Sequence, residues 1–271
     1  MKLKFTFLSL FFLSIASYAN DRFFTYIYQS NVLEKKQKEI EVWNTFRFKK
    51  ETFFRAFEPR IEFEIGIGKN TQTAFYLNIG HSATAIPNGS EPELEKETEF
   101  SFSNEWKHQF SNPVAQKLGS AIYGELTLGL NEIELEGKLI LDKQVKKWLF
   151  VHNTVFEYEI EKEPAYANGN LKMKRNHEFK LDFNFGVCYF LKKGFTVGLE
   201  AVQKNVFTPT EKLEHSAMYF GPNASWRMDN FWITATILPQ IAGFKGNAYD
   251  RKLNLTEFER LQTRLIFSYA F

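Results

Sequence analysis

The residues whose types and spacing could do chemistry are charged side chains that alternate with apolar ones. Glu132, Glu134 and Glu136 follow one another at every second position. Side chains two apart on a strand lie on the same face, about 7 Å from one another. A strand here would therefore carry a row of three carboxylates, which repel one another unless cations lie opposite. The pattern predicts a charged surface.

The same alternation places many charged side chains on one polar face. Its candidate members are Glu62, Glu64, Glu125, Glu132, Glu134, Glu136, Lys180, Asp182, Arg260 and Arg264. If this face lines an open passage, the local charge sets the selectivity of that passage. If the face is closed off, opposite charges pair across strands, and basic residues such as Lys138, Arg260 and Arg264 neutralise the three glutamates. Both interpretations stay open at this point.

The sequence offers little for catalysis or metal binding. The five histidines, at positions 81, 108, 152, 177 and 215, are scattered. Two of them are followed directly by serine, and adjacent residues face opposite sides of a strand. The single cysteine, Cys188, can form neither an internal disulfide nor a cysteine-based zinc site, and we expect it to be a core or lumen residue. We expect no enzyme activity, no catalytic residue, no metal and no cofactor.

The elements that must carry this face are strands, because the apolar period is two almost throughout. In one segment, Phe179, Leu181, Phe183 and Phe185 alternate with polar residues. Most segments are longer than a typical globular strand and long enough to cross a bilayer at a tilt. Twelve segments are predicted: 39–50, 53–68, 72–85, 94–110, 117–130, 132–142, 147–162, 171–190, 194–206, 215–228, 230–243 and 255–271.

The connections favour a membrane barrel. Short turns near 69–71, 143–146 and 192–194 alternate with longer loops, which are predicted at 86–93, 163–170, 207–214 and 244–254. Short turns on one side and long loops on the other are typical of outer-membrane barrels. We therefore predict an all-β fold, a transmembrane antiparallel up-and-down β-barrel of about 12 strands spanning 39–271. The alternative is a soluble β-sandwich or a lipocalin-like barrel.

The first residues read as a signal peptide. Lys2 and Lys4 precede an apolar stretch of about 11 residues, too short to span a membrane, and Ser17 and Ala19 suit a cleavage site after residue 19. Residues 20–38 follow neither pattern, being aromatic over 23–28 and charged over 34–38. We expect them to form a periplasmic segment or a segment folded into the lumen.

Composition narrows the class of partner. Hydrophobic residues make up 44% of the 271 residues, and 30 of them are Phe, which excludes intrinsic disorder. Without Lys2 and Lys4, 32 basic residues balance 32 acidic ones. A neutral chain gives no reason to expect nucleic acid as a partner.

The two ends of the mature chain carry a family resemblance. Residues 264–271 read RLIFSYAF, with aromatic residues at Phe267, Tyr269 and Phe271. This resembles the C-terminal strand that bacterial outer-membrane barrels present to the barrel-assembly machinery. Segments 24–28 and 39–43 are similar to those of an uncharacterised family of outer-membrane barrels, itself distantly similar to barrels associated with phenol-degradation pathways.

The resemblance implies a location, partners and a function class. It implies the bacterial outer membrane, with outer-membrane lipid and the assembly machinery as partners, and it supplies no catalytic residue. The expected function is a narrow channel or transporter for small solutes whose small-molecule ligand is unknown. The alternative is a structural or surface-exposed barrel with a filled lumen and no transport role.

Overall fold

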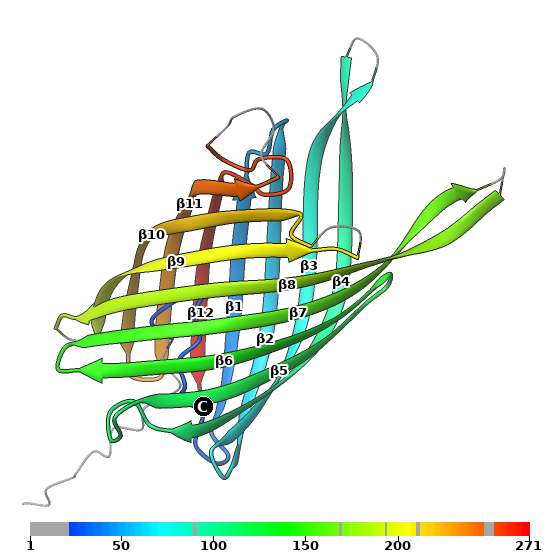
Figure 1. Ribbon diagram of the computed structural model, residues 1–271. Coiled ribbons are helices and arrows are strands. Elements are labelled where there is room, and N and C mark those ends of the chain that lie inside the picture. The colour runs from blue at the N-terminus through cyan, green and yellow to red at the C-terminus, as the bar shows by residue number, and fades with distance from the viewer. Residues whose placement is uncertain (1–21, 89–90, 168–169, 193, 210–211, 247–251) are drawn as a thin grey trace, which may run out of the picture.

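The computed structural model of the chain is a closed antiparallel barrel in which each strand pairs with its sequence neighbours and the last pairs with the first (Figure 1). The structure describes residues 22–88, 91–167, 170–192, 194–209, 212–246 and 252–271. The predicted signal peptide, 1–19, lies outside this range. The strands are β1 (Lys38–Phe48), β2 (Phe54–Gly68), β3 (Thr71–Asn88), β4 (Glu91–Ser111), β5 (Gly119–Gly129), β6 (Glu132–Val145), β7 (Trp148–Ala167), β8 (Asn170–Phe190), β9 (Phe195–Phe207), β10 (His215–Met228), β11 (Phe231–Lys245) and β12 (Leu261–Ala270).

The prediction of an up-and-down barrel with twelve strands is confirmed. Within the barrel wall, closure pairs both edges of every strand, so that the wall itself has no open sheet edge. Among the described residues, no helix is long and apolar enough to cross a membrane.

Alternation along each strand separates the two faces of the wall. On β5, Ala121 and Tyr123 are buried, whereas Ile122 and Leu126 between and beyond them are exposed. Large aromatic side chains on the outer face of β4 are about half exposed, at 50–57%: Phe100, Phe102, Trp106 and Phe110. The outer surface is therefore an apolar belt, and the polar residues of the same strands point into the barrel.

Two hairpins extend beyond the rim on the long-loop side, β3 with β4 and β7 with β8 (Figure 1). The predicted loops at 86–93 and 163–170 are wrong, because strand pairing continues to Asn88↔Glu91 and Ala167↔Asn170. Beyond the rim each hairpin has no further neighbouring strand, so proline can be accommodated without breaking a wider sheet. The final strand also begins later than predicted, at Leu261, because 255–258 form a turn and a bend.

Residues 22–37 enter the lumen from the short-turn end, and we call them the plug. Figure 1 shows them inside the barrel wall. Phe24 and Ile27 are fully buried and pack against Leu149, Val151 and Cys188 on the wall. The plug fills the half of the lumen that lies toward the short turns, and Cys188 is one of the small apolar residues that receive it.

Candidate functional site

Two buried wall side chains, Glu200 and Asn153, bond the backbone of the first part of the plug. Glu200 on β9 accepts hydrogen bonds from the amides of Thr25 and Tyr26, both at 2.9 Å. Asn153 on β7 accepts from the amide of Tyr28 at 2.7 Å and donates to its carbonyl oxygen at 2.8 Å. Because neither wall residue is exposed, each bond replaces water for a buried backbone group.

The second part of the plug is held in the same way. Asp142 on β6 accepts from the amide of Ser30 at 2.8 Å and from its hydroxyl at 2.7 Å. Gln72 on β3 accepts from the amide of Leu33 at 2.9 Å. The anchoring side chains thus come from strands all around the barrel, and the plug crosses the lumen from wall to wall.

Gly66 on β2 is where the plug leaves the lumen. Its carbonyl oxygen accepts from the amide of Lys36 at 2.7 Å, and its amide donates to the carbonyl oxygen of Gln37 at 3.0 Å. A Cβ at this position would lie 2.0 Å from the carbonyl oxygen of Glu34. Glycine is therefore required for the plug to lie this close to the wall.

Above the plug, on the side of the long loops, the lumen opens into a cavity of about 490 Å³, which we call the vestibule. Tyr26 and Tyr28 of the plug line it together with wall residues. The plug therefore forms the floor of the vestibule. Solvent reaches the vestibule from the loop side and meets this floor in mid-lumen.

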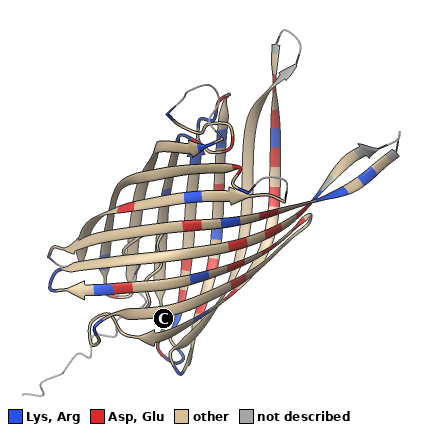
Figure 2. Cartoon of the chain, viewed as in Figure 1, with Lys and Arg blue, Asp and Glu red and all other residues tan. Residues whose placement is uncertain are grey.

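One wall of the vestibule is acidic. It is formed by β6 and β7, and acidic residues gather on these neighbouring strands in Figure 2. Lys180 on β8 bonds Glu157 and Glu159 at 2.5 and 2.6 Å, and Lys138 bonds Glu136. The carboxylates of this wall that line the vestibule are Glu132, Glu134, Glu136, Glu157 and Glu161.

The facing wall is basic. Arg47 on β1 and Arg264 on β12 lie diametrically opposite β7 and β6 in the strand order, and Arg60 lies on the next strand, β2. Glu58 of β2 lines the same wall and pairs with Arg47 at 3.0 Å, so Arg60 and Arg264 carry most of its positive charge. The guanidinium group of Arg264 lies 4.1 Å from the ring centre of Tyr26 and donates to the hydroxyl of Thr45 at 2.8 Å. Charges of opposite sign on facing walls place an electric field across the vestibule.

The candidate residues from the sequence divide between the two halves of the lumen. Those that line the vestibule are Glu125, Glu132, Glu134, Glu136, Asp182 and Arg264. Lys180 belongs to the acidic wall through its ion pairs, whereas Glu62 and Glu64 are buried at the level of the plug. Arg260 differs from the prediction, because it precedes β12 at the rim and its side chain is exposed.

Several charged residues of the lumen were missed by the sequence reasoning. They are Glu39, Glu41, Glu105, Arg47 and Arg60. Period-two alternation, the pattern that identified the other lumen residues, could have found them, since Glu39 and Glu41 alternate with the outward-facing Ile40 and Val42.

A closed barrel with an apolar belt outside and charged residues inside has the architecture of an outer-membrane-type β-barrel. The chain belongs to the family of unknown function DUF6662, whose model matches residues 16–271.

Solved structures with the same fold share little sequence with the chain. The COG4313 outer membrane channel from Pseudomonas putida F1 has 8% identity and a TM-score of 0.63, with 89% of this chain and 98% of that chain covered. The translocator domain of the autotransporter NalP from Neisseria meningitidis has 10% identity and a TM-score of 0.62, covering 89% and 91%. The NanC porin has 10% identity and a TM-score of 0.51, covering 85% and 98%. A search of curated proteins gave no match.

Proposed function

We propose that this chain is an outer-membrane barrel that admits small solutes to the vestibule and passes them when the plug shifts. The observation that carries the proposal is the vestibule itself, a water-accessible cavity with facing acidic and basic walls that ends on the plug. The plug is held mainly by bonds from wall side chains to its backbone and not by a strand ladder. Such a segment can leave without opening the barrel.

The vestibule suits small polar solutes. Its volume of about 490 Å³ is within the range of small-molecule sites. The acidic wall favours cationic groups, and the uncharged ring of Tyr26 beside Arg264 gives the floor an apolar element.

The proposed location is the bacterial outer membrane, reached by export with a cleaved signal peptide. The apolar belt supports contact with lipid, and at the short-turn end the rings of Tyr269 and Phe271 are more than half exposed. We propose that Phe267, Tyr269 and Phe271 are the signal that the assembly machinery reads. A non-catalytic role remains our prediction.

Location and assembly are tested together in cells. The folded protein should fractionate with the outer membrane and change its gel mobility on boiling, and the mature chain should begin at Asn20 by intact mass. Deleting Phe271 should lower the amount of inserted barrel while leaving the stability of the inserted fraction nearly unchanged. Insertion of this variant at the wild-type level would remove the assembly role.

A structural barrel with a permanently filled lumen is the second candidate. It is favoured by the burial of the plug, whose Thr25 and Ile27 are fully buried. Under this alternative, the charged walls serve to stiffen the barrel.

Conductance in planar bilayers separates the two candidates. A solute channel should show brief openings in the wild-type protein. The conductance of each opening should equal the conductance of a variant lacking residues 22–34. A barrel with a permanent filling should show no current in the wild type and steady current only in the variant. The second result would contradict the transport proposal.

A further inference from the structure

Four glutamates form a block on the lumen face of β1 and β2, beside the plug. The pairing register places Glu39 directly opposite Glu64 and Glu41 directly opposite Glu62. All four side chains are at most 1% exposed. Like charges directly opposite one another on neighbouring strands are destabilising, so this block requires a positive partner.

Hydrogen-bond donors fix part of the block and leave a defined set of oxygens. The indole nitrogen of Trp43 donates to Oε2 of Glu41 at 2.7 Å, and that of Trp232 donates to Oε1 of Glu39 at 2.5 Å. Oε1 of Glu41, Oε2 of Glu39 and both oxygens of Glu62 are buried and accept no hydrogen bond. Buried carboxylate oxygens without a partner are costly, and those of Glu62 lie within the block.

The positive groups of the protein do not balance this charge. Arg22 of the plug lies 3.5 Å from Glu41, and its guanidinium is stacked between the rings of Tyr28 and Trp43 at 3.9 and 4.4 Å. Lys107 on β4 also faces the block, but the carboxylate of Glu105 beside it adds another negative charge. Arg60 and Lys138 also reach Glu62 and Glu105, but both are shared with a further carboxylate, Glu125. Arg22 and Lys107 are thus the cationic side chains that face the block most directly.

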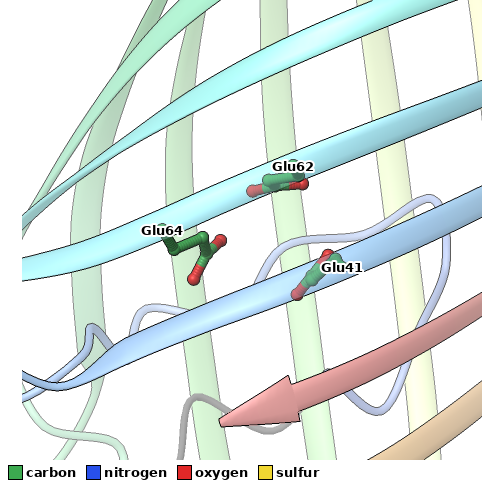
Figure 3. Close-up of side chains that lie close together, drawn as sticks. All are labelled: Glu41, Glu62 and Glu64. Carbon is green, nitrogen blue, oxygen red and sulfur yellow. The ribbon is translucent and has the colours of Figure 1, made fainter. Parts of the chain in front are cut away.

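We propose that Glu41, Glu62 and Glu64 bind a divalent cation, with Ca²⁺ as the preferred ion. Each of the three residues offers a carboxylate oxygen, and these oxygens lie within 4.8 Å of one another. Figure 3 shows Glu62 and Glu64 on β2 and Glu41 on the adjacent β1 grouped on the same side of the wall. Ca²⁺ takes carboxylate oxygens in flexible geometry, whereas Mg²⁺ demands a stricter octahedron. The ion joins the first two strands of the barrel next to the plug.

A second group of carboxylates provides the contrast within the same molecule. Glu132, Glu134 and Glu159 also bring oxygens within 4.8 Å, but all three are partly exposed, and Glu132 and Glu134 line the vestibule. Lys180 neutralises Glu159 at 2.6 Å, and water reaches the others. The vestibule group therefore needs no ion, and it serves as the matched control.

The test uses the purified full-length barrel in detergent, stripped with a chelator and titrated with Ca²⁺, Mg²⁺ or Tb³⁺. Trp43 and Trp232 bond the glutamates of the block, so Tb³⁺ bound there should emit when tryptophan is excited, and Ca²⁺ should displace it. The thermal unfolding midpoint should rise with Ca²⁺ more than with Mg²⁺. Glu62→Gln should weaken Ca²⁺ binding roughly tenfold or more, and Glu132→Gln should leave it unchanged.

Three outcomes would overturn the proposal. One is a wild-type protein whose tryptophan-sensitised emission and unfolding midpoint do not respond to these ions. Another is loss of binding in Glu132→Gln with retention in Glu62→Gln, which would place the ion in the vestibule. The third is a block stabilised by acidification and not by Ca²⁺, which would mean that protons neutralise it. If Glu62→Gln fails to fold, the wild-type titration decides.

Discussion

The two halves of the lumen are lined by the same kinds of polar and charged residue, but one half is filled by the plug and the other is open to water. In the half toward the short turns, Glu200, Asn153 and Asp142 bond the backbone of the plug and are almost fully buried. In the half toward the long loops, Glu132 and Glu134 face a water-accessible vestibule. The strands impose the same inward polarity on both halves, so the difference comes from the plug.

This comparison shows that a polar wall does not by itself define a passage. A carboxylate that accepts two backbone amides is a structural anchor, whereas one facing water is available to a solute. Four substitutions or deletions test whether the two halves differ as described, beginning with the largest expected effect.

Removing residues 22–34 should have the largest effect on stability. The deletion leaves Glu200, Asn153, Asp142 and Gln72 without the backbone partners that they bond. An unsatisfied buried group costs about 1–3 kcal/mol, and water entering the emptied half should offset part of the sum. We therefore expect a loss of several kcal/mol in urea unfolding. Unchanged stability would mean that the plug is only loosely held.

Replacing a single anchor should have the next largest effect. Glu200→Ala removes the acceptor of two plug amides and of the Thr236 hydroxyl, which lies at 2.5 Å. Because hydrogen bonds to charged groups contribute about 1.5–3 kcal/mol, we expect a loss of at least about 3 kcal/mol in urea unfolding. The control Glu132→Ala, in the vestibule, should change stability by less than about 0.5 kcal/mol. Equal losses would remove the distinction between the halves.

Crowding the plug at its exit should have a smaller effect. Gly66→Ala places a Cβ against the carbonyl oxygen of Glu34, and overpacking of this kind costs about 1–3 kcal/mol. The control is Gly137→Ala on the outer face, where the added Cβ would lie 3.9 Å from its nearest neighbour, the carbonyl oxygen of Tyr123. The first variant should lower the unfolding midpoint and raise the opening frequency in bilayers, and the second should do neither. If neither variant changes the unfolding midpoint or the opening frequency, the plug lies farther from β2 than described.

The smallest expected effect on stability belongs to the acidic wall. Glu132 and Glu134 lie directly opposite Glu161 and Glu159 across β6 and β7. Replacing both with Gln relieves like-charge pairs, so stability should rise by roughly 0.2–1 kcal/mol. In the variant lacking the plug, the reversal potential should show a loss of cation preference. A preserved preference would move the selective residues to another part of the lumen.

The sequence alone predicts most of the barrel wall but little of the plug inside it. Period-two alternation specifies which face of β6 or β12 is polar, because a slip of one residue would turn the apolar belt inward. It also finds Glu125, Lys180 and Arg264 inside the barrel. The prediction for Arg260 is wrong because it extended the alternation to residues before the start of β12, where a bend changes the direction of the chain.

The plug and the glutamate block depend on contacts that no local pattern encodes. Residues 22–37 have no period, and their anchors lie on strands far along the chain, so only the closed barrel defines their place. Glu39 and Glu64 face each other through the register of β1 with β2. That register depends on the β1–β2 connection at 49–53, whose conformation cannot be deduced from the apolar pattern.

The large sequence separation between the plug and its bonding partners has a consequence for the order of folding. The bonds Tyr28–Asn153, Arg22–Thr234 and Thr25–Arg264 join residues separated by 125, 212 and 239 positions. Contacts of such high sequence separation form late, because the loops that they close are costly before the rest of the chain is in place. The first described residues of the chain are thus among the last to find their native partners. Arg22 and Thr25 can complete their bonds only after β11 and β12 have formed, so the plug is fully in place only when the seam between β1 and β12 closes around it.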